Sequence, residues 1–428
     1  MNNSYNHITL FEHQALKADR LYNGVLFTEK HRLALESFYG ETGLPYYKLI
    51  HRGVQFNEFV GVLQMGNLTI EVLPKADKYS NKNDWRTILI GMLKAVGAFD
   101  IHAPSTSALK VKSNFILDLY FELFIREVEY LFNKGLIKRY RSSEGNKLAL
   151  KGRILFSKHI QQNIVHQERF YTKYSTYDQI HLIHKILYKT LLLLKHINTN
   201  VSLKSRIGNL LLNFPEMNNL SVTEEVFEKL VLDRKSKDYK NTLEISKLLL
   251  LNYHPDLSNG QNNVLALMFD MNLLWEKFIY VSLRKQIKPE MNISSQTSKY
   301  FWESVKGNRS SIRPDILLTT RDKIVVLDTK WKNIGDKNPS PDDLRQLYIY
   351  HEYYDAMKVA LIYPGDKNII SGTFFMTEKE KIKASSSSNP IDNKICSIIK
   401  IPTNTTITNW QASICELVYD QWLTPNEN

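Results

Sequence analysis

Two aspartates near the C-terminal end of the chain have a spacing that suits metal-dependent chemistry. Asp315 precedes one short aliphatic run and Asp328 follows another, with the polar segment 320–323 between them. Two such runs around a short polar turn are typical of a β-hairpin. If the four polar residues form the loop, Thr319 pairs with Ile324, and Asp315 lies opposite Asp328. Carboxylates that face each other repel unless a cation lies between them, so this hairpin is a candidate metal site.

Lys330 lies two residues after Asp328 and therefore on the same face of the strand. Oxygen ligands from Asp315, Asp328 and the carbonyl of Thr329 suit Mg²⁺, a hard cation. A metal held there would polarise a phosphoryl oxygen and activate a water, which phosphodiester hydrolysis requires. Lys330 would orient or deprotonate that water, or stabilise developing negative charge. The alternative is an ordinary hairpin whose polar residues face water, because such short patterns recur by chance.

Three more polar residues lie on helices expected on either side of the hairpin. The first helix is predicted over 265–283, and its Glu276 would add a carboxylate to the metal. The second is predicted to end at Tyr354, and it places Gln346 and Tyr350 four residues apart on one face. These two would hydrogen-bond the metal shell, a water or a phosphate. Taken singly, Glu276 also fits a surface position and Tyr350 a packing role.

The pattern of apolar residues divides the chain of 428 residues, which is long for one core, into three parts. Residues 1–105 are rich in strand-like runs and close with a helix predicted over 84–96. Residues 106–256 have helical periodicity. Residues 257–428 alternate helices and strands, which is an α/β order.

The chain is basic, with 56 Lys and Arg residues against 44 Asp and Glu residues and a net charge of +12. This balance favours polyanionic partners, nucleic acid above all. A cluster of cations lies between the first two predicted helices of the middle part, within 134–158. It is either a surface for phosphate or a partner, or a solvated face of a basic protein. Its members are Lys134, Lys138, Arg139, Arg141, Lys147, Lys151, Arg153 and Lys158.

Other classes of site are disfavoured. The two cysteines, Cys396 and Cys415, form neither a zinc motif nor a disulfide framework, so a reducing, cytoplasmic location is expected. No apolar run is long enough to span a membrane. The glycine spacing at 61–66 resembles a phosphate-binding loop, but Asn67 and Leu68 stand where Lys and Ser or Thr are required. We therefore expect that the chain itself binds no nucleotide.

The ordered set Pro314-Asp315, Asp328-Thr329-Lys330 resembles the PD-(D/E)xK nuclease motif, with Asp rather than Glu at 328 as an accepted variant. The pair Gln346 and Tyr350 resembles the QxxxY helix of the RecB-like branch. Blocks at 61–75, 150–156 and 269–278 are similar to the McrC family, and the likeness spans roughly residues 50–360. It implies a multidomain protein: an N-terminal β-rich, barrel-like domain, an α-helical middle region and a C-terminal α/β PD-(D/E)xK restriction-endonuclease-like domain.

The resemblance also implies a function. McrC proteins are Mg²⁺-dependent (Mn²⁺ is also possible) endonuclease subunits of restriction systems that cleave modified, methylated double-stranded DNA. They act with McrB, a hexameric AAA+ GTPase whose GTP hydrolysis they stimulate, and the middle region is the expected partner-binding part. Self-dimerisation through the nuclease domain is also expected, because cutting both strands usually takes two sites. Two alternatives stay open: a non-cleaving adaptor that activates the partner, and a stand-alone nuclease of repair or phage defence.

Overall fold

The fold is that of a computed structural model, which describes residues 6–43, 45–76, 81–97, 116–218, 220–254, 263–320, 323–335, 337–375 and 394–423. The chain forms two compact units that alternate along the sequence. Unit 1 contains residues 1–6, 62–69 and 100–267, and unit 2 contains 7–61, 70–99 and 268–428. The boundaries expected at 105 and 256 fall in segments outside the described residues, so the three-part division stays a prediction.

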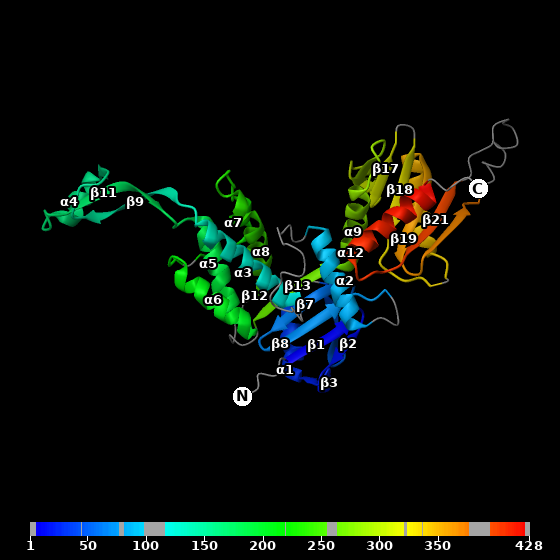
Figure 1. Ribbon diagram of the computed structural model, residues 1–428, viewed down its shortest axis with the longest axis horizontal. Helices are drawn as coiled ribbons and strands as arrows, with labels where there is room; N and C mark the ends of the chain where they lie inside the picture. Colours follow the sequence, from blue (N-terminus) through cyan, green and yellow to red (C-terminus); the bar gives the residue numbers. More distant parts are fainter. Residues whose placement is uncertain are drawn as a thin grey trace. The chain divides into compact units, whose positions relative to one another are not determined.

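Unit 1 is a helical body that carries a long β-ribbon (Figure 1). Its helices are α3 (Ile116–Lys134), α5 (Leu182–Ile197), α6 (Val201–Asn213), α7 (Glu224–Glu228) and α8 (Lys240–Leu251), preceded by the short 3₁₀ turn η2 (Lys237–Tyr239). The ribbon consists of β9 (Arg139–Lys147), β10 (Arg153–Ile154), α4 (Phe156–Asn163) and β11 (Phe170–Asp178). Strands β9 and β11 pair antiparallel over their whole length. We call residues 139–178 the arm, because Figure 1 shows this segment extending away from the helices of its unit.

The arm was not expected, since the middle region was predicted to be helical. The sequence of β9, RYRSSEGNK, is polar and almost wholly exposed. A strand that buries neither face has no alternation of apolar residues, so periodicity could not reveal it. The cationic cluster at 134–158 therefore lies largely on a β-ribbon rather than between two helices.

The N-terminal strands form open sheets. A five-stranded sheet has the order β1-β8-β7-β13-β12, and two small sheets have the orders β2-β6-β5 and β3-β4. None of these sheets closes on itself in the described part of the chain, so the expected barrel-like arrangement is corrected. The reason is that β13, which follows the middle region in sequence, takes the place beside β7. The bounds are β1 (Asn6–Phe11), β2 (Ala15–Lys17), β3 (Arg20–Tyr22), β4 (Val25–Phe27), β5 (Tyr47–Ile50), β6 (Gly53–Phe56), β7 (Phe59–Met65), β8 (Leu68–Leu73), β12 (Tyr253–His254) and β13 (Val264–Asp270), with helices α1 (Glu29–Thr42) and α2 (Lys82–Ala95).

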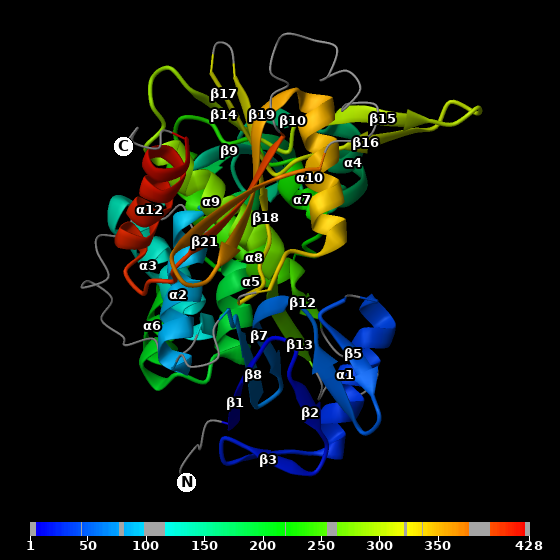
Figure 2. The same cartoon turned by 90° about the vertical axis from the view of Figure 1, so that its right-hand side faces the viewer.

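Unit 2 contains a six-stranded mixed sheet with the order β14-β17-β18-β19-β21-β20 (Figure 2). Strands β18, β19 and β21 are parallel, and the outer pairs are antiparallel. Helix α10 packs on β18 and β19 through Leu347, Tyr350 and Tyr354. The bounds are α9 (Met271–Lys285), β14 (Asn292–Ser295), β15 (Lys299–Glu303), β16 (Arg309–Ile312), β17 (Ile316–Thr319), β18 (Ile324–Thr329), α10 (Pro341–Tyr354), β19 (Ala356–Pro364), β20 (Asn368–Thr373), β21 (Ile395–Ile401), α12 (Ile407–Cys415) and the π-helical segment η3 (Glu416–Leu423).

The helix predicted over 265–283 is partly wrong, because Val264–Asp270 is strand β13 and α9 begins only at Met271. Asp270 caps α9 by accepting hydrogen bonds from the N–H groups of Asn272 and Leu273. The helix predicted over 84–96 is confirmed as α2, and the one expected to end at Tyr354 is confirmed as α10. No helix in the described part of the chain has both the length and the apolar character that a membrane span requires.

Candidate functional site

The predicted hairpin is present as strands β17 and β18. Thr319 pairs with Ile324 and Ile316 pairs with Leu327, as the four-residue loop requires. Asp328 is the next residue outward on β18, and Asp315 lies one residue before the start of β17. On its other side β18 pairs in parallel with β19, so Asp328 lies inside the sheet rather than at its edge.

Asp328 is a buried carboxylate, 1% exposed. Burial raises its pKa well above the usual range, and the charge of Asp315 raises it further, whereas Lys330 acts in the opposite direction. Its Oδ2 atom lies 2.9 Å from Lys330 Nζ. Within the described residues that oxygen accepts no hydrogen bond of good geometry. A buried oxygen held by one ion pair beside a second carboxylate is a position that a cation would stabilise.

Asp315 is held in place by Thr329. The backbone N–H and the hydroxyl of Thr329 both donate to Asp315 Oδ2, at 2.6 and 2.8 Å. Thr329, which lies between Asp328 and Lys330, thus fixes the orientation of the Asp315 carboxylate. Thr329 acts here through its backbone N–H and its hydroxyl. That its carbonyl is a metal ligand stays a prediction.

Lys330 begins a line of hydrogen bonds that runs to α10. Its Nζ lies 3.2 Å from Gln346 Oε1, and Gln346 Nε2 donates to the Tyr350 hydroxyl at 2.7 Å. Tyr350 in turn donates to the backbone carbonyl of Arg313 at 3.0 Å. Burial alone would lower the pKa of Lys330, but the charge of Asp328 and its other acidic neighbours raise it above the usual value. The predicted residues Lys330, Gln346 and Tyr350 are therefore brought together.

Glu276 lies at the edge of this group on α9. It is buried, and burial first and the charge of Asp315 second raise its pKa. Its Oε1 accepts a hydrogen bond from Gln296 Nε2 at 2.9 Å, and the backbone N–H of Gln296 donates to the carbonyl of Asp315 at 3.0 Å. Gln296 was not identified from the sequence, since a lone glutamine in an exposed loop carries no signal.

The carboxylate oxygens of Asp315 and Asp328 suit a hard divalent cation. Glu276, predicted as a further ligand, does not converge with them into a group of three ligands. No three His, Cys, Asp or Glu side chains in the described residues converge closely enough to hold a metal ion. Each carboxylate has a partner from the chain instead: Gln296 for Glu276, Thr329 for Asp315 and Lys330 for Asp328. The pair Asp315 and Asp328 fits a metal on the chemistry of its donors and on the poorly satisfied Oδ2 of Asp328.

A cavity of about 500 Å³ lies beside the line of hydrogen bonds. Its lining comes from the segment before Asp315 and from α10, and consists of Ser298, Ser311, Ile312, Arg313, Gln346, Ile349 and Tyr350. Gln346 and Tyr350 thus face an open, polar depression as well as the lysine. Lys330 itself does not line this cavity; Gln346 is the residue that connects the two, through its hydrogen bond with the lysine.

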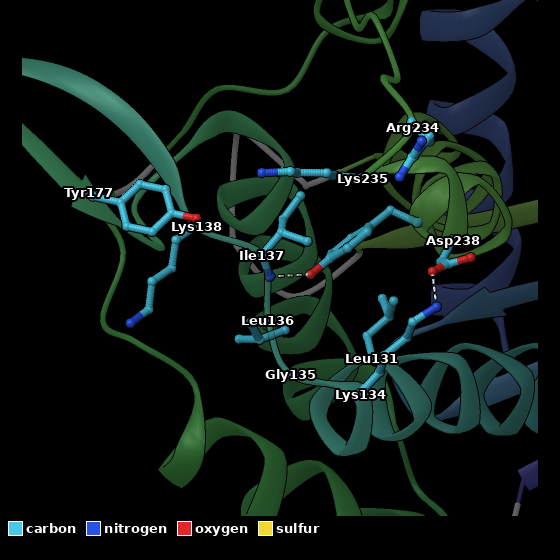
Figure 3. Close-up of a pocket in the computed structure, with 11 residues that line it drawn as sticks. Leu131, Lys134, Gly135, Leu136, Ile137, Lys138, Tyr177, Arg234, Lys235 and Asp238 are labelled. Carbon is cyan, nitrogen blue, oxygen red and sulfur yellow. Dashed lines mark hydrogen bonds and ion pairs between the residues drawn. The ribbon is translucent and has the colours of Figure 1, made fainter.

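A second cavity of about 500 Å³ lies in unit 1, where the arm joins the helices (Figure 3). It is lined by the cations Lys134, Lys138, Arg234 and Lys235, together with Leu131, Gly135, Leu136, Ile137, Tyr177, Asp238 and Tyr239. Lys134 forms an ion pair with Asp238, and the Ile137 N–H donates to the Tyr239 hydroxyl. Its one lining carboxylate, Asp238, is already paired with Lys134, so this cavity has no pair of carboxylates like Asp315 and Asp328. It lies where the arm begins.

Much of the cationic cluster is neutralised within unit 1. Ion pairs join Arg139 to Asp233, Arg141 to Asp178 and Lys158 to Glu144. The ammonium groups of Lys147 and Lys151 lie over the Tyr174 ring, at 5.2 and 5.6 Å. The cluster is thus built into the arm and is only partly a free basic surface.

Comparison with known proteins settles the family. A family model described as "McrBC 5-methylcytosine restriction system component" matches residues 54–364. The chain belongs to this family. The expected likeness to McrC is thereby confirmed, and the match covers the arm, the hairpin and α10 of this McrBC family protein.

Relatives of known sequence or structure agree. "Type IV methyl-directed restriction enzyme EcoKMcrBC" of Escherichia coli (strain K12) is 23% identical over 258 residues, which are 56% of this chain and 73% of the relative. A chain in the refined half-complex from a tetradecameric assembly of Thermococcus gammatolerans McrB AAA+ hexamers with bound McrC has a TM-score of 0.73 at 19% identity. That match covers 96% of this chain and 100% of the other. A cryo-EM structure of the Thermococcus gammatolerans McrBC complex matches with a TM-score of 0.51 at 17% identity, over 66% and 88% of the two chains. These structures show that the fold is shared.

Proposed function

We propose that this chain is the DNA-cleaving subunit of a McrBC-type restriction system, and that it hydrolyses phosphodiester bonds of methylated DNA. The observation that carries the proposal is the buried Asp328 beside Asp315, with Lys330 reaching both Asp328 and Gln346. These contacts support the assignment of a PD-(D/E)xK site with Asp at the second acidic position. The name of the Escherichia coli relative, a methyl-directed restriction enzyme, supports the same substrate.

Asp315 and Asp328 would hold Mg²⁺ or Mn²⁺, with the Thr329 carbonyl and Glu276 as further oxygen donors. When bound, the metal supplies an activated water and neutralises charge on the phosphate. The chain's own contribution is positional. Thr329 keeps Asp315 oriented, and Gln296 keeps Glu276 beside the carbonyl of Asp315. These contacts hold the oxygen donors near one another before substrate arrives.

Lys330 is the residue of the site that faces the substrate phosphate. An ammonium group has three donors; one is directed at Gln346, and the charge is also balanced by the ion pair with Asp328. A remaining donor is available to a phosphate oxygen or to the attacking water. The Tyr350 hydroxyl accepts a hydrogen bond from Gln346 Nε2 and so fixes the amide that holds Lys330. Lys330 thus orients the reacting groups and stabilises the negative charge that develops on the phosphate.

The AAA+ GTPase partner would bind the arm. The far end of the arm carries a group of exposed aliphatic and aromatic side chains, which a protein surface normally covers. These are Leu148, Leu150, Phe156, Ile160, Ile164 and Val165, between 59% and 81% exposed. The solved assembly contains McrB hexamers with bound McrC, so a projecting element is a fitting contact for such a ring. GTP hydrolysis would belong to the partner and be stimulated by this chain.

The test is cleavage of a methylated plasmid by the chain together with its AAA+ partner, Mg²⁺ and GTP. Asp328→Asn and Lys330→Ala should each lower cleavage at least about 100-fold. Both variants should stimulate the partner's GTPase as the wild type does. Asp342→Asn is the matched control, because this carboxylate on α10 is exposed and pairs only with Arg345 in the described chain.

Other outcomes separate the alternatives. Wild-type cleavage by both Asp328→Asn and Lys330→Ala would contradict the site. Stimulation of the partner without any cleavage by the wild type would make the chain a non-cleaving activator. Cleavage of unmodified DNA without partner or GTP would make it a stand-alone nuclease. Sedimentation of the assembly on DNA would test whether two copies pair to cut both strands.

A further inference from the structure

A two-stranded ribbon in unit 2 takes no part in the six-stranded sheet. Strands β15 and β16 pair only with each other, with Lys299 opposite Ile312 and Glu303 opposite Arg309. The ribbon ends three residues before Asp315. Figure 2 shows it extending beyond α10, away from the body of its unit. We call residues 299–312 the site hairpin.

The site hairpin exposes large aromatic side chains together with cations. Tyr300 is 70% exposed and Trp302 57%, and Val305 at the turn is fully exposed. The guanidinium of Arg309 lies over the Tyr300 ring at 5.1 Å, and Lys306 is exposed in the turn. Such a concentration of apolar surface on a projecting ribbon marks an interaction site.

The site hairpin is ordered by its own contacts, so its surface is preformed. In the turn, the Ser304 N–H donates to the carbonyl of Asn308 at 2.7 Å, and Gly307 adopts a φ of 84°. At the base, the Phe301 ring packs against Tyr353 of α10 with 5.2 Å between ring centroids. The Lys299 ammonium donates to the Tyr353 carbonyl at 3.0 Å. A ligand would therefore bind a rigid ribbon at small entropic cost.

The base of the site hairpin leads directly into the candidate active site. The Tyr350 hydroxyl donates to the carbonyl of Arg313, the residue after β16, and also orients Gln346 beside Lys330. The polar cavity of about 500 Å³ lies between these same segments, with Ser311 and Arg313 on one side and Gln346 on the other. The base of the site hairpin thus borders the same cavity as Gln346, which contacts Lys330.

We propose that the site hairpin enters a groove of duplex DNA beside the scissile phosphate, a role that rests on the nuclease function proposed above. A two-stranded β-ribbon matches the width of the major groove. Lys306 would contact a phosphate, while Tyr300 and Trp302 would pack on sugars and base edges. Arg309 already pairs with Glu303 at 3.2 Å and lies over the Tyr300 ring, so it would hold that ring in place. A duplex held in this way presents one backbone to the cavity and to Lys330. The exposed aromatic rings, the cation Lys306 in the turn and the continuity with the proposed phosphate-cleaving site favour DNA over a protein surface.

The test compares two hairpin variants with matched controls. One variant is Tyr300→Ala combined with Trp302→Ala, and the other is Lys306→Glu. Phe375→Ala replaces another exposed aromatic of unit 2, and Lys48→Glu replaces another exposed lysine. Binding of a fluorescein-labelled duplex to each full chain is followed by anisotropy at several salt concentrations, and plasmid cleavage is measured with the partner present.

We expect the double variant to bind the duplex roughly tenfold more weakly and to cleave correspondingly less. Lys306→Glu should reduce the slope of log affinity against log salt by about 1. The controls should bind and cleave as the wild type does. Thermal unfolding of every variant checks that the fold is retained. In the unmutated chain, photo-crosslinking to a bromodeoxyuridine-substituted duplex should label a peptide that contains Trp302.

Different results would contradict the DNA-binding role of the site hairpin and the nuclease function on which it rests. If the wild type neither binds nor cuts the duplex, the nuclease function is wrong. If the wild type cuts and the hairpin variants bind and cut equally well, the DNA-binding role of the site hairpin is overturned. Loss of partner GTPase stimulation with unchanged duplex affinity would also overturn it, because the ribbon would then be a protein contact.

Discussion

Glu12 places a buried carboxyl group against Trp331, the residue that follows the lysine of the candidate site. Trp331, the residue after Lys330, donates its indole N–H to Glu12 Oε1 at 2.8 Å, and the Lys75 N–H donates to the same oxygen at 2.8 Å. The side chain is 6% exposed, and its other oxygen has no partner in the described residues. Burial raises the pKa of Glu12 from 4.5 to about 7 despite these two donors. The N-terminal strands thus fix the strand end that carries Lys330.

Glu12→Gln should stabilise the protein in a pH-dependent way. Below about pH 4.5 the carboxyl is protonated in both the folded and the unfolded state, so it costs nothing. Between about pH 4.5 and 7 the unfolded state ionises while Glu12 of the folded state stays protonated, so the wild type loses stability over this range and the loss is complete above pH 7. An amide does not ionise and loses none. The free energy of unfolding of the variant should exceed that of the wild type by on the order of 1–3 kcal/mol above pH 7.

The measurement is chemical unfolding of both proteins across this pH range. Glu36→Gln is the control, because that carboxylate of α1 is exposed and pairs with Arg32 at the surface. A stability difference for Glu12→Gln that does not change with pH would show that ionisation of Glu12 is not the cause.

Thr329 should act as a positioning residue for Asp315. Thr329→Val keeps the shape of the side chain but removes the hydroxyl donor at 2.8 Å, leaving only the backbone N–H on Asp315 Oδ2. Loss of such a supporting contact lowers activity about 10- to 100-fold. The loss should appear in the rate of single-turnover cleavage, with duplex affinity unchanged. Thr329→Ser should restore the rate, and failure of that rescue would mean that the methyl group matters instead.

At the scale of elements, the arm depends on one glycine. Gly152, which precedes β10, has a φ of 78°. A Cβ atom there would lie 2.3 Å from the carbonyl oxygen of Lys173 and 2.9 Å from the Cα of Tyr174, both on β11. Close approach of two backbones and a left-handed conformation both require glycine at this position.

Gly152→Ala should therefore distort the far end of the arm. If the arm binds the AAA+ partner, the variant should lose most of its stimulation of GTP hydrolysis while still binding duplex DNA. Gly145→Ala is the matched control, because Gly145 lies on β9 of the same arm and has open space around its Cα. Equal stimulation by the two variants would remove the arm from the partner interface.

Elements with strong local signals were predictable from the sequence. The register of β17 and β18 follows from two aliphatic runs and a four-residue loop, and it was predicted correctly down to the pair Thr319 and Ile324. The predicted spacing of Gln346 and Tyr350 on one helix face is confirmed, because the two side chains hydrogen-bond each other and Gln346 contacts Lys330. Their predicted contacts with a metal shell, a water or a phosphate stay predictions. In each case neighbours in the chain decide the geometry.

Elements whose partners are distant in sequence were not predictable. Strand β13 has the apolar composition of a buried helix, and its pairing with β7, about 200 residues earlier, decides its conformation. Strand β9 buries none of its residues, and its backbone pairs with β11, which follows it in sequence only after α4. Gln296 and Glu12 reach the site only through tertiary contacts, so no local pattern marks them.

At the scale of the whole molecule, the arm belongs to unit 1, whereas the candidate site around Asp315, Asp328 and Lys330 belongs to unit 2. Neither unit is a continuous piece of chain, because the polypeptide passes between them after residues 6, 61, 69, 99 and 267. A fragment that contains one unit therefore lacks strands that complete it. Point variants in the full chain are the appropriate way to separate binding of the partner from cleavage of DNA.

This organisation predicts that an inactive chain interferes with an active one. Lys330→Ala retains the arm, so in excess it should occupy the AAA+ partner and lower plasmid cleavage by the wild type in proportion to its share of the total chain. Gly152→Ala with Lys330→Ala in the same chain should not interfere, because its distorted arm cannot compete. Cleavage is measured at fixed wild-type chain and limiting partner. Equal inhibition by the single and the double variant would show that the arm does not determine partner binding, and that contacts elsewhere in the chain recruit the GTPase.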